Sequence, residues 1–162
     1  MSGASQMRIR TASLRDHEVL CELFDELDAF HRVARPEMFQ AFAGPARTRE
    51  QLARWLSDAG SMILVAESGD GVVGLAVLLT RPTPMFAGAV PRRVIELDNL
   101  VVRVDQRNRK IGRRLLAATM DWVRDRKATH VEVGVHAFNK DARRFYEGFG
   151  FQPSIDRLML MA

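Results

Sequence analysis

Apolar and polar positions along this chain follow two periods, one near 3.6 residues that is typical of helices and one of two residues that is typical of strands. In order, the pattern predicts strands at 7–10, 62–67, 72–79, 94–102, 130–135 and 155–161, and helices at 13–35, 48–59, 111–126 and 140–148. This order predicts a mixed α/β (α+β) fold, with antiparallel hairpins first and a β-α-β crossover later.

Local start and turn signals support several of these elements. Ser13 with Asp16, and Thr48 with Gln51, have the three-residue spacing of capping boxes, which predict helix starts. The stretch at 68–71 reads Ser-Gly-Asp-Gly and predicts a tight hairpin between two strands. The second and third predicted strands should therefore pair in antiparallel fashion.

Length and composition indicate one domain spanning residues 1–162, with residues 1–6 expected to be disordered. The 162 residues, 47% of them hydrophobic, suffice for one buried core. No apolar run approaches the roughly 20 residues that cross a bilayer, and the first ten residues lack the apolar stretch of a signal peptide. Cys21 is the single cysteine, which excludes an internal disulfide and favours a reducing, cytoplasmic location without membrane contact.

Charge indicates an anionic partner. The chain carries a formal charge of +4 and has a pI near 10.0, and its arginines cluster at 103–114. A phosphate-bearing ligand explains this cluster at least as well as nucleic acid, and no predicted strand interleaves the aromatic and basic residues typical of an RNA-binding sheet. His17, His130 and His136 lack ligand-like spacing with cysteine or acidic partners, so no metal site is predicted.

Two carboxylates lie on the predicted strand at 94–102. Residues two apart in a strand share a face, so Glu96 and Asp98 should project together, about 7 Å apart, with Leu100 and Val102 following on the same side. The simpler interpretation is a solvent-facing surface kept soluble by acids. The functional one is a proton acceptor, or a site for a cationic substrate, with a pKa raised by partial burial.

A short basic loop joins this strand to the helix predicted at 111–126. Its sequence from Arg107 to Gly112 is Arg-Asn-Arg-Lys-Ile-Gly. Positive side chains at a helix N-terminus oppose the helix dipole by up to about 1 kcal/mol each, a cost that a bound anion reverses. An ordinary charged surface turn is the alternative.

The region 131–151 contains the third candidate. Asn139 suits a helix N-cap, and Tyr146 follows at helical spacing with other aromatic residues. Tyr146 is either a core aromatic or a phenol that donates a proton to a leaving group.

These pieces, in this order and spacing, closely resemble the GNAT superfamily of acyl-CoA-dependent N-acyltransferases. The family's phosphate-loop motif Q/R-x-x-G-x-G/A is matched by Arg107 and Gly112, with Lys110 in place of the first glycine. Its second motif, N-x-x-A-x-x-F-Y-x-x-x-G-F, is matched in full by Asn139, Ala142, Phe145, Tyr146, Gly150 and Phe151. The resemblance spans roughly residues 9–161.

The resemblance implies a central mixed sheet of about six to seven strands, antiparallel in its N-terminal part, with a splayed parallel pair in the middle and four helices around it. It also implies an enzyme that transfers an acetyl group from acetyl-CoA, its cosubstrate, to a primary amine. The cofactor-binding residues it implies are Leu100, Val101, Val102, Arg107, Asn108, Arg109, Lys110, Ile111, Gly112, Arg113, Asn139 and Tyr146. In the implied catalytic set, Tyr146 is the general acid, while Glu96 or Asp98 is the base.

By the same resemblance, the acceptor site should be lined by the first helix pair and by the proline-rich loop at 81–91. The expected acceptor contacts are Phe30, His31, Met85 and Phe86, although His31 also suits a helix-end surface residue. The acceptor itself stays open among small amines, amino acids, antibiotics and protein amines. Two alternatives to the enzyme are a catalytically silent acyl-CoA-binding module and a basic nucleic-acid-binding domain. The chain is expected to be a monomer or a homodimer.

Overall fold

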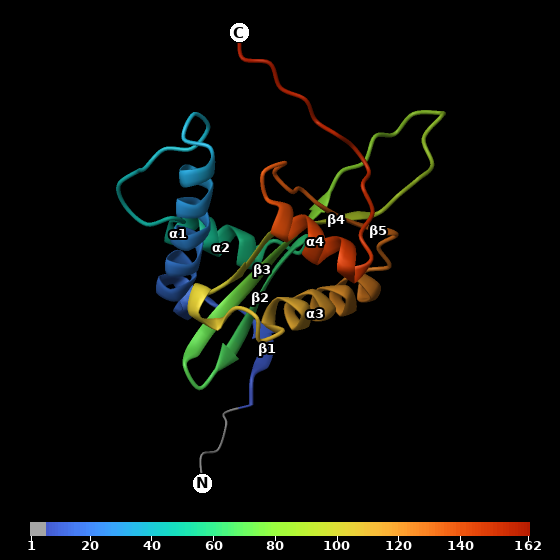
Figure 1. The fold of residues 1–162 in the computed structure, drawn as a ribbon. Coiled ribbons are helices and arrows are strands. Elements are labelled where there is room, and N and C mark those ends of the chain that lie inside the picture. The colour runs from blue at the N-terminus through green and yellow to red at the C-terminus, as the bar shows by residue number, and fades with distance from the viewer. Residues whose placement is uncertain (1–5) are drawn as a thin grey trace.

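The computed structural model describes residues 6–162, and a single twisted sheet runs through the middle of the molecule (Figure 1). The sheet has five strands in the spatial order of the chain: β1 (Arg8–Thr11), β2 (Ser61–Ser68), β3 (Gly71–Arg81), β4 (Val94–Val102) and β5 (His130–Val133). The first three pairings are antiparallel and the β4–β5 pairing is parallel. The mixed α/β fold is confirmed, while residues 1–5, most of the segment predicted to be disordered, lie outside the described residues.

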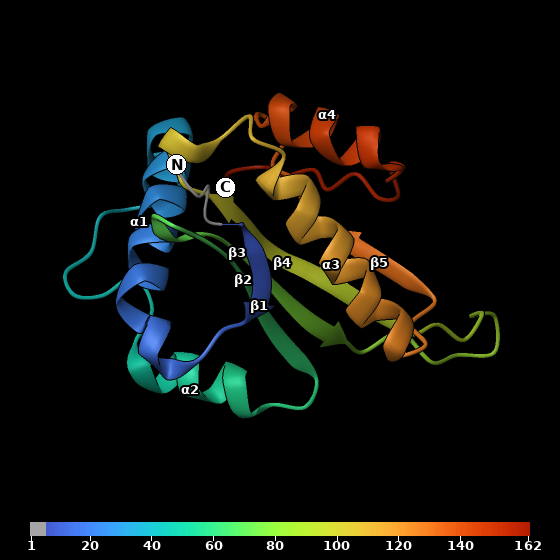
Figure 2. The ribbon, with the colours of Figure 1, turned by 90° about the horizontal axis from the view of Figure 1, so that it is seen from below.

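Four α-helices cover the two faces of the sheet. α1 (His17–Ala34) and α2 (Arg49–Ser57) pack on one face, and α3 (Ile111–Asp125) and α4 (Lys140–Phe149) lie on the other (Figure 2). Two short 3-10 turns precede α1 and α3, at Leu14–Asp16 and Val104–Gln106. Because both faces are covered, β3 is buried at seven consecutive positions, from Val72 to Leu78.

The predicted helix starts are confirmed at atomic detail. Ser13 caps the first 3-10 turn, and the side chain of Asp16 accepts a hydrogen bond from the Ser13 N–H at 2.8 Å, which completes the capping box. The hydroxyl of Thr48 accepts from the N–H of Gln51 at 3.1 Å. These contacts satisfy amides that the helix itself leaves without acceptors.

The prediction of a last strand at 155–161 is wrong. Residues 152–162 have no regular secondary structure, so the sheet has five strands rather than the six to seven expected. A strand forms only where a neighbouring strand accepts and donates its backbone hydrogen bonds, and alternation of side chains alone does not supply that neighbour.

A bulge on β4 changes which side chains face which helix layer. Asn99 pairs with Val77 and Leu97 pairs with Leu78, which leaves Asp98 as an extra residue on β4. After the bulge, Leu100 and Val102 pack against the core beneath α3, together with Leu97, and no longer share a face with Glu96. The prediction that Leu100 and Val102 follow the two carboxylates on the same side is therefore wrong.

β4 and β5 are paired over only part of β4. Pairing runs from Val94–His130 to Leu97–Val133, and β4 then continues for five more residues without β5 beside it. The expected splay of the parallel pair is thus confirmed. Its opening begins at the bulge, so the backbone of 98–102 is free on the side that faces away from β3.

Within residues 6–162, no helix combines the length and apolar character needed to cross a membrane.

Candidate active site

The loop before α3 has a backbone conformation suited to anion binding. Asn108 and Lys110 both have φ of +62°, in the left-handed region that glycine normally occupies. Lys110 is the N-cap of α3 and, within the described chain, contributes no side-chain cap. The first N–H groups of a helix have no acceptor inside the helix, so those of Ile111, Gly112 and Arg113 remain available to an anion.

Basic side chains of this loop are partly held by the protein itself. Arg107 donates from Nε to the carbonyl of Val102 at 3.1 Å, and Arg109 donates from Nη1 to the side chain of Gln106 at 3.1 Å. The guanidinium of Arg113 lies 5.5 Å from the centre of the Phe149 ring. These contacts fix positive charge around the start of α3.

Three parts of the chain converge at Gly112. A Cβ at that position would lie 3.4 Å from the ring of Phe145 in α4 and 3.8 Å from the side chain of Val102 in β4. Three elements therefore meet at one point: the end of β4, the start of α3 and the part of α4 that carries Phe145 and Tyr146. Val102, Gly112 and Phe145, which belong to three separate motifs of the sequence, are neighbours in space.

The two carboxylates of β4 share one arginine. Arg81, at the end of β3, donates from Nε to Glu96, and its Nη2 lies 3.7 Å from Oδ1 of Asp98. Both carboxylate side chains are 28% exposed. Partial burial is the main cause that raises the pKa of Asp98, and the negative charge of Glu96 adds to it, while Arg81 and Arg47 act in the opposite direction.

Tyr146 lies in α4 with only 8% of its surface exposed. Its ring contacts those of Phe145 and Phe151, with centroids 5.2 and 5.5 Å away. Burial raises the pKa of its phenol to about 12, so the group is protonated throughout the neutral range. Asn139 caps the same helix through a 3.0 Å hydrogen bond from the Ala142 N–H to its side chain, as predicted.

An aromatic cluster joins segments that are far apart in the sequence. His31 and His136 lie 5.0 Å apart between ring centroids, and Phe138 stacks on His136 at 5.4 Å. Phe30 and Phe39 complete this aromatic–histidine cluster through contacts of 5.3 to 5.7 Å. It connects the C-terminal end of α1 and the loop after it with the loop that follows β5, and so bridges the side on which β4 and β5 diverge.

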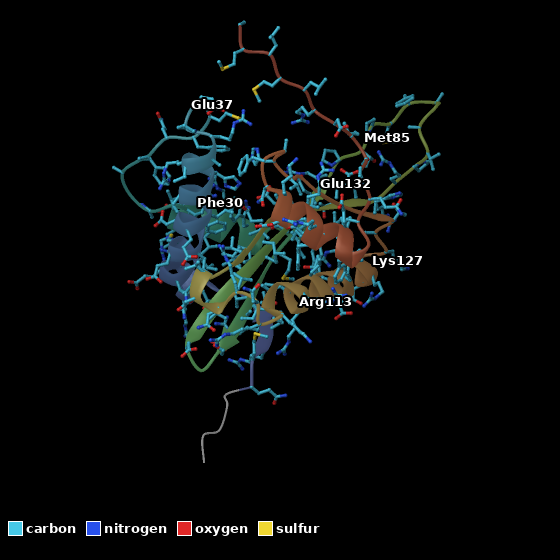
Figure 3. All side chains as sticks on the ribbon, viewed as in Figure 1. Phe30, Glu37, Met85, Arg113, Lys127 and Glu132 are labelled. Atoms are coloured by element: carbon cyan, nitrogen blue, oxygen red, sulfur yellow. The ribbon has the colours of Figure 1, made fainter. Side chains whose placement is uncertain are left out.

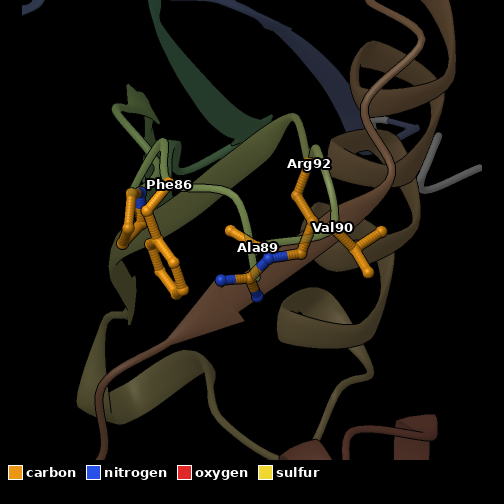
Figure 4. A pocket seen from close by; sticks show the side chains of 5 residues that line it. Phe86, Ala89, Val90 and Arg92 are labelled. Atoms are coloured by element: carbon orange, nitrogen blue, oxygen red, sulfur yellow. The ribbon is translucent and has the colours of Figure 1, made fainter.

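The expected acceptor residues fall into two separate places. Phe30 and His31 belong to the aromatic–histidine cluster, whereas Met85 lies on the loop between β3 and β4, on the opposite side of the molecule (Figure 3). Met85 is 96% exposed and Phe86 is 67% exposed. The loop between β3 and β4 forms a small pocket of its own, lined by Pro84, Phe86, Ala89, Val90 and Arg92 (Figure 4). The structure does not bring the two halves of the predicted acceptor wall together.

Sequence reasoning missed four residues of this region: Arg81, Phe39, His136 and Phe138. In the β3–β4 register Glu96 pairs with Leu79, and Arg81 lies two residues further along β3. The sequence does not state this register, so it could not predict that Arg81 reaches Glu96. Phe39, His136 and Phe138 lie in loops, where periodicity carries no information.

The comparison with protein families decides the identity of this arrangement. The sequence profile of the acetyltransferase (GNAT) family matches residues 23–151, which is most of the chain. The chain belongs to the GNAT acetyltransferase family. The matched region contains α1 from Leu23 onward, the β4 carboxylates, the loop before α3 and Tyr146, so every residue of the candidate site lies within it.

This GNAT protein matches one relative over nearly the whole of both chains and a second relative over part of each chain. An uncharacterised N-acetyltransferase of Bacillus subtilis (strain 168), YhfO, is 28% identical over 147 residues, covering 90% of each chain. N-acetyltransferase 8B of Rattus norvegicus is 33% identical over 98 residues, which are 60% of this chain and 42% of the rat protein. Both carry the acetyltransferase description in their names.

Solved structures have the same GNAT fold. A tetramutant of the BH1408 protein from Bacillus halodurans superposes with a TM-score of 0.90 at 21% identity, covering 96% of this chain and 99% of the other. The aminoglycoside N-acetyltransferase AAC(6')-Iy, solved in complex with CoA, gives a TM-score of 0.76 at 17% identity, covering 100% and 98%. At these identities the similarity concerns the fold.

Proposed function

We propose that the protein is an N-acetyltransferase that moves the acetyl group of acetyl-CoA to a primary amine of a small molecule, peptide or protein. The observation that carries this proposal is the meeting of three elements at Gly112: the splayed end of β4, the uncapped start of α3 and the helix that contains Tyr146. Family membership supports acetyl transfer, and the meeting of these elements supports the roles proposed for their residues below.

The residues around the loop fit an acyl-CoA. The N–H groups of 109–113, with Arg107, Asn108, Arg109, Lys110 and Arg113 around them, suit a pyrophosphate, and the free backbone of Leu100, Val101 and Val102 suits the amide groups of a pantetheine arm. Bound there, acetyl-CoA supplies the acetyl group as a thioester. Asn139 lies at the start of α4 on the same side, and its amide nitrogen remains free to donate while its oxygen caps the helix.

Asp98 is the proposed base. An alkylammonium group has a pKa of about 10.4 and attacks a carbonyl only after it loses a proton. Burial raises the pKa of Asp98, which improves its match to this task, while Glu96 is engaged by Arg81 and adds negative charge beside it. Asp98 therefore accepts the proton, and Glu96 keeps the pair attractive to a cation.

Tyr146 and the backbone of β4 act on the other reactant. The N–H of Val101 or Val102 polarises the thioester carbonyl, a role worth roughly 3 kcal/mol in comparable cases. When the bond from nitrogen to the acetyl carbon forms and the carbon–sulfur bond breaks, the leaving sulfur takes the phenolic proton of Tyr146. A phenol with a pKa of about 12 still holds that proton at neutral pH.

The acceptor enters beside the aromatic–histidine cluster. Phe30 and His31 lie there with His136 and Phe138, and the rings present faces that attract an ammonium group. Met85 and Phe86 remain candidate contacts for an extended acceptor that reaches the loop between β3 and β4.

The test combines binding and turnover. Thermal unfolding with acetyl-CoA at about 100 times its dissociation constant should raise stability by about 2.7 kcal/mol, or roughly 5–10 °C in Tm. An amine panel with a free-thiol readout should then show amine-dependent release of CoA that is lost in Asp98→Asn and kept in Asp121→Asn, whose carboxylate is 72% exposed on α3. Ligand-induced stabilisation with equal turnover in both variants would contradict the base assignment. Stabilisation without turnover on any amine would favour the silent acyl-CoA-binding alternative.

A further inference from the structure

Arg47, in the loop between α1 and α2, is a largely buried arginine that the proposed acetyl transfer does not use. Its side chain is 21% exposed. Nη1 donates to Oδ2 of Asp28 at 3.0 Å and to the carbonyl of Ala46 at 2.6 Å. The guanidinium also lies 4.4 Å from the centre of the ring of Phe24, which is fully buried. These contacts fix the position and the plane of the guanidinium before any ligand binds.

One edge of this guanidinium is not used. Within residues 6–162, all the side-chain hydrogen bonds of Arg47 start from Nη1, and neither Nε nor Nη2 has an acceptor. The N–H groups of Nε and Nη2 are parallel, an arrangement that binds both oxygens of a carboxylate at once. The protein thus holds the arginine by one nitrogen and leaves its Nε–Nη2 edge available to a ligand.

Arg47 lies on the same side of the sheet as the two carboxylates of β4. The ring of Phe24 belongs to the core cluster between α1 and the sheet, and Leu79 packs against that cluster. Glu96 pairs with Leu79, and paired residues of antiparallel strands project to the same face. The charge of Arg47 also lowers the pKa of Asp98, although no ion pair joins the two side chains in the described part of the chain.

The site therefore presents both signs of charge at fixed places. Glu96 and Asp98 suit an ammonium group, and the Nε–Nη2 edge of Arg47 suits a carboxylate. An α-amino acid carries both groups on one carbon atom. A simple alkylamine and the N-terminus of a peptide carry the ammonium group without the neighbouring carboxylate, so they would leave the arginine edge without a partner.

We propose that the acceptor is an amino acid with a free carboxylate, and that Arg47 selects it by binding this carboxylate through Nε and Nη2 while the amino group lies at Asp98. The inference rests on the proposed acetyl transfer and narrows its acceptor from primary amines in general. The reaction itself is unchanged. The amino nitrogen loses its proton to Asp98 and bonds to the acetyl carbon, CoA leaves as the thiol with the proton of Tyr146, and the carboxylate and Arg47 do not react.

The aromatic–histidine cluster is placed to receive the side chain of this amino acid. Asp28, which holds Arg47, precedes His31 by three residues and so lies on the same face of α1. His31 contacts the rings of Phe30, Phe39, His136 and Phe138. An aromatic side chain suits these rings, and L-phenylalanine is therefore the probe.

The turnover experiment compares three amines that differ only at the carboxyl position: L-phenylalanine, L-phenylalaninamide and phenethylamine. With acetyl-CoA and a free-thiol readout, kcat/KM should be about 10- to 100-fold higher for L-phenylalanine than for the other two. In Arg47→Gln this ratio should fall to near one, with the change in KM larger than the change in kcat. Arg47→Lys keeps the charge without the paired N–H groups and should retain only part of the preference.

The matched control is Arg49→Gln, two residues further along. Arg49 is exposed and donates to the carbonyl of Leu14 at 3.3 Å, so its loss should leave the preference for L-phenylalanine as in the wild type. Circular dichroism confirms that each variant is folded. The comparison of the three amines on the wild-type protein needs no variant, and equal kcat/KM for all three would by itself overturn the inference.

Binding of the product separates this inference from the proposed function. N-acetyl-L-phenylalanine and its carboxamide are titrated calorimetrically into the protein with CoA present, and the carboxylate form should bind about 10- to 100-fold more tightly in the wild type but not in Arg47→Gln. Turnover of the three amines without a preference would overturn the amino-acid acceptor and leave acetyl transfer standing. A preference in binding without turnover of any amine would support the carboxylate site and contradict acetyl transfer. A preference that survives in Arg47→Gln would overturn the role of Arg47, and neither turnover nor preferential binding would overturn both proposals.

Discussion

Nη2 of Arg81 lies 3.7 Å from Oδ1 of Asp98, at the bulge where β4 loses its regular pairing with β3. Arg81 also binds Glu96 directly, so one arginine neutralises two acids unequally. Burial first, and the charge of Glu96 second, raise the pKa of Asp98 against the opposing effect of Arg81.

Substitution Glu96→Gln should therefore lower the pKa of Asp98. It removes a repulsive charge and frees Arg81 to bind Asp98, and both effects favour the ionised form. If Asp98 is the base, the fall of kcat/KM toward acidic pH should move to lower pH in this variant. A pH profile measured with a fixed amine tests this expectation, with Asp121→Asn as the control. An unmoved acidic limb would exclude Asp98 as the group that sets it.

Tyr146 can be titrated without interference from other tyrosines, because it is the only one in the chain. The absorbance of tyrosinate should develop with a pKa of about 12 in the folded protein, against about 10 after unfolding. Since the fold favours the neutral phenol, ionisation of Tyr146 destabilises the protein as pH rises from about 10 to about 12.

The same residue provides a test of acid catalysis. Tyr146→Phe should lower kcat by about 10²- to 10⁴-fold, while acetyl-CoA affinity and Tm stay near those of the wild type. The ring keeps its packing against Phe145 and Phe151, which accounts for the retained stability. Equal loss of affinity and kcat would indicate a packing role instead.

The sequence predicts local structure well wherever a residue acts on its near neighbours. Ser13, Thr48 and Asn139 cap helices because each reaches an amide two or three positions away. The turn at 68–71 closes the β2–β3 hairpin for the same reason. These contacts depend on spacing along the chain, which the sequence states directly.

Features that depend on distant partners were not predictable in the same way. The bulge at Asp98 is defined by pairing with Val77 and Leu78, and alternation along β4 contains no trace of it. The aromatic–histidine cluster draws on 30–31, 39 and 136–138, which only the fold brings together. The tail at 155–161 has a strand pattern but no strand partner within its own described chain, so the pattern alone gave the wrong element.

Lys110→Gly should stabilise the protein by up to about 1 kcal/mol. Lys110 has φ of +62°, which is unfavourable for a residue with a Cβ and open to glycine, although glycine also gains entropy in the unfolded chain. Denaturant unfolding at neutral pH provides the measurement. Arg109→Gly is the control, because the neighbouring residue has no positive φ and its loss also removes the contact with Gln106; it should destabilise. Acetyl-CoA affinity should survive in Lys110→Gly if the backbone of the loop, more than the lysine charge, holds the phosphates.

Gly74→Ala should damage both stability and acetyl-CoA binding. A Cβ at Gly74 would lie 2.9 Å from the carbonyl oxygen of Val101 and 3.1 Å from the side chain of Leu115, so β4 must shift. Overpacking of this kind costs about 1–3 kcal/mol. Gly148→Ala is the matched control, because nothing lies within 4 Å of its added methyl group. Loss of stability without loss of affinity in Gly74→Ala would mean that the backbone near Val101 does not contact the ligand.

The histidine pair should make stability depend on pH below neutrality. Burial first, and the charge of His136 second, lower the pKa of His31 from its ordinary value of 6.5, while Asp28 and a hydrogen bond to the backbone of Leu27 act against the shift. The unfolded chain therefore binds the His31 proton at a higher pH than the fold does. The contribution of neutral His31 to stability is fully present above pH 6.5. It is lost as pH falls from 6.5 through the lowered pKa that His31 has in the fold.

His136→Phe keeps an aromatic ring in the cluster and removes the charge of His136 from beside His31, so the pKa of His31 should rise toward its ordinary value. Proton NMR of the histidine rings measures this shift, and Tm against pH should fall less steeply on the acidic side than in the wild type. His130→Gln, an exposed histidine on β5, should leave both curves unchanged. If the pKa of His31 stays where it was, burial alone sets it, and the 5.0 Å contact between the two rings has no electrostatic consequence. The proposed contact of the cluster with the acceptor would then depend on the shape of the rings and not on their charge.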